Sequence, residues 1–161
     1  MKASEIVWHN EESVRFMQSL SKLSEEEWRR PLGPGKWTIA EVAGHFAPWN
    51  RFILERRLPY LILGDPMPDG PGADELNARS ARDSRGRSRD ETIAEFVTVR
   101  RQLIAALRDL PAGDWSREFQ IGKSRMTLGH YFAGMIAHDQ HHFRQIRQAA
   151  RNPVFIFPLL S

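Results

Sequence analysis

Apolar side chains recur every three to four residues along most of this chain, and this spacing limits the fold more than any other feature. Four long stretches carry it, with polar residues between the apolar ones; they cover residues 6–23, 38–57, 88–110 and 127–150. No stretch alternates convincingly at the period of two that is typical of strands. The sequence therefore predicts an all-α fold, a four-helix bundle.

Capping residues and a proline refine the expected helix bounds. Ser24, Thr38 and Ser88 each stand three residues before a glutamate, which is the pattern of a capping box. The first box starts a short turn that carries Trp28, and the other two start the second and third long helices. Pro48 lies inside the second helix, where its missing N–H and its ring predict a kink.

The segment between the second and third helices has a different composition. Residues 59–72 are rich in Pro, Gly and Asp and lack a sustained helical period, so we expect a long crossover loop there. A brief helical piece is predicted over residues 73–81. The arginine-rich stretch 79–90 has the composition of a solvated linker. Farther along, residues 114–125 are polar and predict a loop or a short hairpin.

Length and composition indicate one domain, residues 1–161, that is large enough to bury a core. No apolar run approaches the roughly 20 residues that span a bilayer. The first residues also lack the long apolar stretch of a secretory signal. We therefore expect a cytoplasmic protein without a membrane partner.

Cysteine is absent, which excludes disulfides and thiolate ligands. A thiol that takes part in a reaction must arrive as a cosubstrate.

Two features bear on macromolecular partners. The net charge is +3, but much of the excess lies in residues 79–89, where no aromatic side chain is interleaved for base stacking. We therefore expect no nucleic-acid partner. Residues 154–160 are strongly apolar, which predicts that they pack on the body of the protein or on a second subunit. A homodimer is the resulting expectation.

His138 and His142 are four residues apart in the last predicted helix, so both imidazoles can reach one ion. They interrupt an apolar stripe that includes Tyr131, Met135 and Ile146, and we expect them to point into the bundle. Imidazoles in an apolar core need a metal, a carboxylate or a hydrogen-bond network. On spacing alone, a satisfied pair of core histidines explains the pattern better than a metal site does.

His45 shifts this balance towards a metal. It lies near the middle of the second helix, on the face shared with Val42 and Trp49. Facing helices of bundles often build metal sites from inward side chains. Three histidines on two helices would leave coordination positions for water or substrate, which is the arrangement of a catalytic site. The sequence thus predicts His45, His138 and His142 as ligands of one divalent ion, Zn, Ni or Fe, with Cu also suited by ligand type.

Other polar residues near this set have weaker assignments. His141 is offset by about one position from the stripe, so it is expected to face a neighbouring helix or the cavity rim, and it could carry a proton. Glu41 could orient His45, although its capping role with Thr38 is favoured. Asp139 is expected to point away from the ion. His9 and His130 are interpreted as residues without a role at the site.

Two stretches resemble a known family. Residues 37–45, Trp-Thr-Ile-Ala-Glu-Val-Ala-Gly-His, are similar to the W-[S/T]-x-x-E-x-x-x-H stretch of the DinB/YfiT-like metalloenzymes. Residues 138–146, His-Asp-Gln-His-His-Phe-Arg-Gln-Ile, resemble the H-x-x-H-H-x-x-Q-I stretch in that family's final helix. Each motif alone is weak, but together they are fairly specific, and with the order of helices they cover nearly the whole chain.

The resemblance implies a bundle with a long crossover between helices 2 and 3, and His45, His138 and His142 as the metal ligands. It also implies a function, because relatives include thiol-dependent S-transferases and isomerases that use bacillithiol, mycothiol or glutathione. DNA binding is not implied by it.

Two functional hypotheses follow. The first is a metal-dependent enzyme that acts on a small-molecule substrate, a thiol-dependent S-transferase or a related hydrolase, in which the ion generates the nucleophile. The second is a stress-related protein that binds and sequesters a small molecule without turnover.

Overall fold

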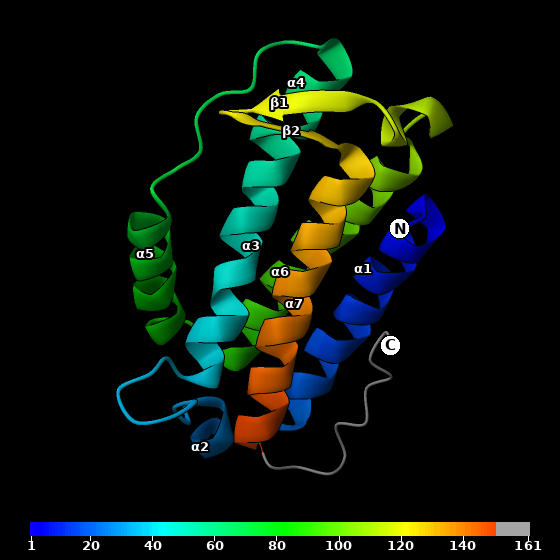
Figure 1. The fold of residues 1–161 in the computed structure, drawn as a ribbon. Helices are drawn as coiled ribbons and strands as arrows, with labels where there is room; N and C mark the ends of the chain where they lie inside the picture. Colours follow the sequence, from blue (N-terminus) through cyan, green and yellow to red (C-terminus); the bar gives the residue numbers. More distant parts are fainter. Residues whose placement is uncertain (151–161) are drawn as a thin grey trace.

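The computed structural model describes residues 1–150, and its four long helices begin close to the predicted positions. They are α1 (Ala3–Ser19), α3 (Ile39–Arg56), α6 (Arg89–Arg108) and α7 (Leu128–Ala150), and they lie side by side in Figure 1. At the start of α3, Thr38 and Glu41 form the reciprocal capping box. At the start of α6, the Ser88 hydroxyl accepts a hydrogen bond from the Glu91 N–H, 3.1 Å away. The predicted four-helix bundle is confirmed.

Shorter elements join these helices. They are η1 (Leu20–Lys22), α2 (Glu25–Trp28), α4 (Leu58–Leu63), α5 (Ala73–Arg85), η2 (Ala112–Trp115), β1 (Glu118–Ile121) and β2 (Ser124–Thr127). The turn that carries Trp28 is the predicted one. Of the two expectations for residues 114–125, the hairpin is the one observed: β1 pairs with β2 antiparallel, and Gly122 in the turn has a φ of +57°. The hairpin lies near the start of α7 (Figure 1).

The crossover between α3 and α6 is more helical than the sequence suggested. Residues 58–63 form α4, because Pro59 occupies the first turn, where a missing N–H costs nothing. The helical piece expected over 73–81 continues to Arg85. The interpretation of residues 79–90 as a solvated linker is therefore wrong for the part that belongs to α5.

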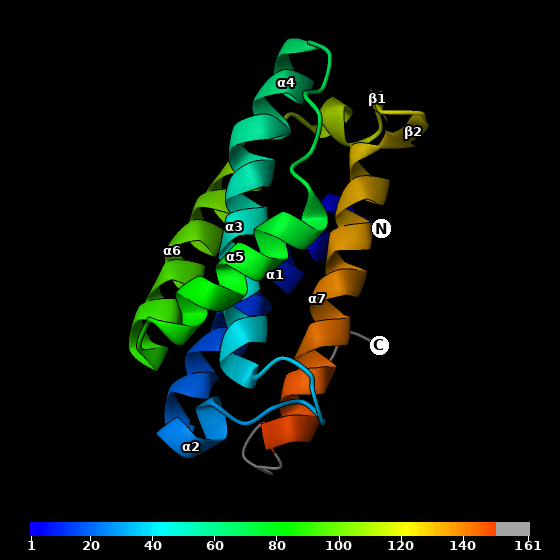
Figure 2. The ribbon, with the colours of Figure 1, turned by 90° about the vertical axis from the view of Figure 1, so that its left-hand side faces the viewer.

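The cause is a set of small residues on one face of α5, namely Ser80, Ala81 and Ser84, which are buried while arginines face outwards. This face packs on α3 (Figure 2). The approach is so close that a Cβ on Gly44 would lie 1.8 Å from the Ser84 hydroxyl oxygen. Gly44, which directly precedes His45, thus lets α5 lie against α3 at the level of the candidate site. The α3 helix itself continues through Pro48.

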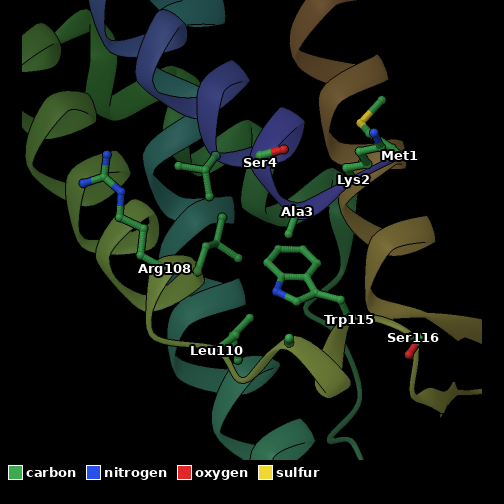
Figure 3. A pocket seen from close by; sticks show the side chains of 11 residues that line it. Met1, Lys2, Ala3, Ser4, Arg108, Leu110, Trp115 and Ser116 are labelled. Carbon is green, nitrogen blue, oxygen red and sulfur yellow. The ribbon is translucent and has the colours of Figure 1, made fainter.

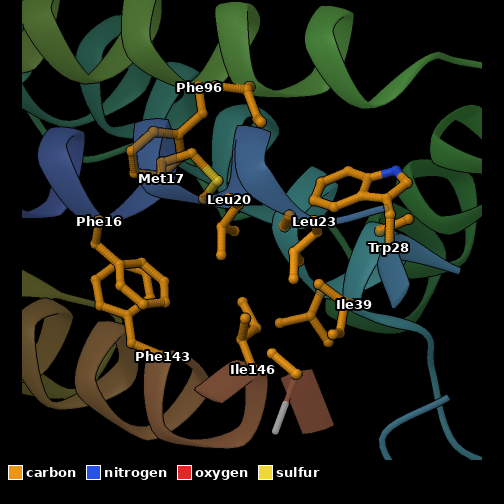
Figure 4. Close-up of a cluster of buried hydrophobic side chains, with 14 of the residues drawn as sticks. Phe16, Met17, Leu20, Leu23, Trp28, Ile39, Phe96, Phe143 and Ile146 are labelled. Carbon is orange, nitrogen blue, oxygen red and sulfur yellow. The ribbon is translucent and has the colours of Figure 1, made fainter. Parts of the chain in front are cut away.

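The apolar core consists of two clusters. Figure 4 shows the first, in which Phe16 of α1 stacks on Phe143 of α7 with ring centroids 4.3 Å apart. This cluster also receives residues from α2, α3 and α6, including Trp28, Ile39 and Phe96. The second cluster lies towards the hairpin end and draws on the same four long helices; its buried members are Ile6, Ile53, Leu58, Leu61, Leu103, Leu107, Leu110, Leu128, Phe132 and Ile136.

A buried polar layer separates the two clusters. It consists of His9 and Asn10 of α1, Asn50 of α3, Arg100 of α6 and Asp139 of α7, each at most 3% exposed. The Arg100 guanidinium donates to both carboxylate oxygens of Asp139, at 2.6 and 3.2 Å. It also donates to the side-chain oxygens of Asn50, at 2.8 Å, and Asn10, at 3.1 Å. The His9 Nε2–H donates to Asp139 over 2.9 Å. One network therefore joins all four long helices.

Two further expectations from the sequence concern membrane-spanning helices and the C-terminal segment. No helix among residues 1–150 is long and apolar enough to cross a membrane. The apolar segment 154–160, on which the homodimer expectation rests, lies outside the described residues.

Replacing Arg100 with Met should strongly destabilise the protein, because the Asp139 charge would stay buried without its cation. Breaking a buried ion pair in this way costs about 3–5 kcal/mol, and urea unfolding monitored by circular dichroism would measure it. The double variant Arg100→Met/Asp139→Leu removes both charges and should regain at least half of that loss. A single variant that loses less than about 1 kcal/mol, the size of an average point mutation, would contradict a structural role for the pair.

Candidate metal centre

Helices α3 and α7 bring the three predicted histidines together. His45 comes from the second turn of α3 and is 2% exposed, whereas His138 and His142 lie one turn apart on α7. One ring nitrogen from each lies within 4.8 Å of the other two. The Nε2 atoms of His45 and His138 are 3.4 Å apart. Two nitrogen ligands of a tetrahedral zinc ion, each bonded at 2.0–2.1 Å, stand about 3.4 Å apart. The donor set therefore fits a single ion.

Hydrogen bonds at the opposite ring nitrogens orient two of these imidazoles. His45 Nδ1–H donates to the backbone oxygen of Val42. His142 Nδ1–H donates to the side-chain oxygen of Gln145 over 2.8 Å. Each bond places the proton on Nδ1 and leaves a lone pair on Nε2, which is the usual state of a metal-binding histidine. Gln145 was not among the predicted site residues, although its spacing of three residues from His142 on a helix was a usable signal.

The environment keeps the three imidazoles neutral. Burial lowers the pKa of His45 from 6.5 to about 3, against the opposing effect of its bond to Val42. Partial loss of hydration, caused by the surrounding side chains, is also the main cause of the lowered pKa of His138 and of His142, and neighbouring imidazoles add to it. Metals bind the neutral form of imidazole, so the site does not have to release protons near pH 7.

The structure corrects the predicted rotation of α7. Its buried stripe passes through Phe132, Ile136, Asp139 and Phe143, one position away from the predicted stripe. His138 is consequently exposed and His142 half-buried, at the edge of the bundle that faces α3. Asp139, which was expected only to point away from the ion, lies in the polar layer. There, burial acts to raise its pKa, but the Arg100 guanidinium and the hydrogen bonds from Arg100 and His9 outweigh burial and hold it well below its usual range.

The remaining candidate residues lie at various distances from this set. The exposed His141 has its ring centroid 5.1 Å from that of His142. The Glu41 carboxylate accepts from the Thr38 hydroxyl and forms an ion pair of 3.1 Å with Arg85. His9, interpreted from the sequence as a residue without a role at the site, bonds to Asp139 in the polar layer. His130 is exposed near the start of α7.

Two hollows in the structure differ in their relation to the histidines. A cleft of about 380 Å³ between α3 and α7 has His138 among its lining residues. A larger hollow of about 600 Å³ lies where the start of α1 meets the end of α6 and Trp115 (Figure 3). None of the three histidines lines this hollow, whereas the cleft reaches His138, so of the two it is the cleft that leads to the candidate metal centre.

Comparison with known proteins agrees with this geometry. The sequence profile of the DinB superfamily matches residues 11–146. The chain belongs to the DinB superfamily. This membership confirms the resemblance seen in the two histidine motifs. It does not by itself assign a reaction to the chain.

Among solved structures, one similar to this DinB superfamily member is YfiT from Bacillus subtilis, described as a probable metal-dependent hydrolase with an unusual four-helix bundle topology. The two chains share 20% sequence identity and a TM-score of 0.74, over 92% of this chain and 86% of YfiT. At this identity the likeness concerns the fold. No curated protein matches the chain.

Replacing Gln145 with Leu should weaken metal binding. The change removes the acceptor that holds His142 Nδ1–H, and losing such an orienting partner typically costs 10–100-fold in metal affinity. Competition with a chromophoric chelator would measure the affinity. Gln148→Leu, at an exposed position of the same helix, is the matched control and should bind as the wild type does. Equal affinities in the two variants would show that Gln145 does not orient a ligand.

The metal-free protein should lose stability as the pH falls from 7 to 5. The folded-state pKa of His45, about 3, lies below its ordinary value of 6.5. Between these values the unfolded chain binds a proton that the folded chain does not, so acidification favours unfolding. One such histidine corresponds to about 1–2 kcal/mol over this interval. The lowered pKa values of His138 and His142 act in the same direction. The lowered pKa of Asp139 acts mainly below about pH 5, outside this window.

Chelator-treated protein unfolded with urea at each pH would test this expectation. His45→Leu should show a smaller change between pH 7 and 5 than the wild type shows. The same change in both proteins would mean that another group is responsible.

Proposed function

We propose that this protein is a metal-dependent enzyme in which His45, His138 and His142 hold one divalent ion, Zn, Ni or Fe. The observation that carries the proposal is the convergence of three neutral imidazoles whose ring nitrogens lie within 4.8 Å of one another. The set contains no fourth side chain among the described residues. Three protein ligands with positions left for exogenous groups are typical of catalytic sites, whereas structural sites are closed by four.

Such an ion, when bound, lowers the pKa of a coordinated thiol or water and so supplies a nucleophile at neutral pH. The chain contributes the orientation of the donors. The bond from His45 to Val42 and the bond from His142 to Gln145 hold the Nε2 lone pairs in place before an ion arrives. The exposed edge of His138 leaves one side open to solvent and to the cleft.

A low-molecular-weight thiol is the nucleophile that we favour, which makes the enzyme an S-transferase. The two buried carboxylates on α3 and α7, Glu41 and Asp139, are both engaged by arginines and are poorly placed to act as a general base. A thiol is deprotonated on coordination and attacks an electrophile without further base catalysis. The chain has no cysteine of its own, so the thiol must be a cosubstrate. His141, beside His142, is the candidate proton carrier.

Water is the alternative nucleophile, and it would make the protein a hydrolase, as is stated to be probable for YfiT.

Sequestration of a small molecule without turnover is a second candidate function. The largely apolar cleft beside His138 favours this candidate, because it could bind a ligand whether or not a reaction follows.

Elemental analysis of untagged protein tests the proposal first. The wild type should contain about one ion per chain after incubation with Zn, Ni or Fe, and His142→Ala should contain none. His130→Ala, which changes an exposed histidine of the same helix, should keep the ion. Absence of metal from the wild type after all three incubations would refute the metal centre.

Turnover assays on the metal-loaded protein then separate the functions. A panel of small electrophiles and esters is assayed with glutathione, bacillithiol or mycothiol and without any thiol. Thiol consumption that requires both the metal and His138 would support the transferase. Product formation without thiol would instead identify a hydrolase, and no turnover in a protein with full metal occupancy would favour sequestration.

A further inference from the structure

The cleft between α3 and α7 is continuous with the candidate metal centre. Its volume, about 380 Å³, falls within the range of small-molecule sites, roughly 300–1,000 Å³. The ring of Phe46 forms part of its wall and lies edge-on to His138 and His142, at centroid distances of 5.9 and 5.8 Å. The end of the cleft nearest the candidate metal centre is therefore the end at His138.

The walls of the cleft are apolar and held in place by their own contacts. Trp49, Ile53, Tyr131 and Met135 line it together with Phe46. The Trp49 indole N–H donates to the side-chain oxygen of Asn77 on α5 over 2.9 Å, which fixes the orientation of the ring. Tryptophan and tyrosine offer large contact areas with few rotatable bonds, so little conformational entropy is lost when a ligand binds.

Asn50 places one hydrogen-bond donor in this apolar surface. Its side-chain oxygen accepts from Arg100 Nε over 2.8 Å, and this bond fixes the amide orientation. The residue is 3% exposed and lines the cleft, yet its Nδ2 group makes no hydrogen bond to the described residues. Asn50 Nδ2 is not among the buried atoms that lack a partner in the described residues, so this nitrogen is open to the cleft. A ligand oxygen can accept a hydrogen bond from Nδ2 there in place of water.

The cleft offers no free charge to an organic ligand. Asp139 is its one lining carboxylate, and both oxygens of that carboxylate accept from Arg100. No lysine or arginine is among the lining residues. The nearby Arg57 guanidinium is already engaged: it stacks on Phe52, donates to the backbone oxygen of Pro68 over 2.7 Å and hydrogen-bonds to the Tyr131 side chain. Away from the ion, a charged group in the cleft would lose hydration without gaining a counter-ion, which is unfavourable.

We infer that the cleft binds the organic part of the substrate, and that the substrate is an uncharged, largely apolar small molecule with a carbonyl-type acceptor that bonds to Asn50 Nδ2. The inference that this molecule reacts rests on the proposed function. Its binding does not, because the walls and Asn50 are in place without an ion. In this arrangement the apolar group fills the space between Trp49 and Met135, and the reacting end lies beside His138.

Phenylacetamide is a suitable probe, since it joins an aromatic ring to a neutral carbonyl group. Phenylacetate has the same shape with a negative charge. The metal-free full-length protein should bind phenylacetamide at least about tenfold more tightly than phenylacetate in calorimetric titrations. Metal-free protein is needed for this comparison because a carboxylate would coordinate an ion directly. Equal or tighter binding of phenylacetate would overturn the inference that the ligand is uncharged.

Gly134 provides the variant that tests the location. It lines the cleft one turn before His138, and a Cβ added there meets no atom within 4 Å. Gly134→Leu should therefore narrow the cleft while raising the helix propensity. Ala137→Leu adds the same side chain at an exposed position of α7 that does not line the cleft. Phenylacetamide affinity should fall at least about tenfold in the first variant and stay unchanged in the second.

Metal content and the contribution of the Asn50 Nδ2 donor are measured in parallel. Gly134→Leu should retain the metal stoichiometry of the wild type, so that a failed metal centre and a failed cleft are distinguishable. Asn50→Asp keeps the acceptor for Arg100 but loses the Nδ2 donor, and it should weaken phenylacetamide binding without changing the metal content. Absence of probe binding in the wild type, or equal binding in Gly134→Leu, would overturn the inference even if the metal is bound.

Discussion

The buried ion pair between Arg100 and Asp139 is the constraint on which the rest of the structure depends. Successive residues of an α-helix are turned by about 100°. When Asp139 is fixed towards the bundle axis by Arg100, His138 and His142 must lie on the flank of α7 that faces α3. Arg100 also bonds to Asn50, which lies on α3, the helix that carries His45. One buried charge pair therefore relates the rotations of the two helices that supply the candidate metal ligands.

A buried charge layer is an expensive way to stabilise a core, because apolar residues of similar size often give equal or greater stability. We interpret the layer as a means of fixing register. The apolar clusters on either side of it could pack with α7 turned by one residue, since aromatic and aliphatic side chains occupy both adjacent stripes. Only one rotation brings Asp139 to Arg100. That rotation also leaves a donor, Asn50 Nδ2, and an open cleft beside His138, so stability and binding share the same residues.

The sequence predicted the helices well because their signals are local. Capping residues act within one turn: the reciprocal box predicted at Thr38 forms, and at Ser88 the hydroxyl caps the Glu91 N–H as expected, without the return bond from the Glu91 side chain. The rotation of α7 could not be predicted in this way. The stripe through Met135 contains no charged residue and so looked like the buried one, whereas the stripe that is buried contains the charged Asp139. Its partner lies 39 residues away in the chain. Arg100 stands within the apolar face of α6 and was the available signal. The extent of α5 was missed for a similar reason: its buried face consists of small residues and depends on Gly44 of another helix.

X-ray absorption spectroscopy of the metal-loaded wild type would show whether all three histidines bind the ion, because the extended fine structure above the absorption edge reports the number of imidazole ligands. We expect three imidazoles at about 2.0–2.1 Å for zinc, together with oxygen or sulfur from solvent or added thiol. A spectrum with fewer than three imidazoles would contradict this expectation, because the rotation fixed by Arg100 and Asp139 would then not be the one that builds the metal centre.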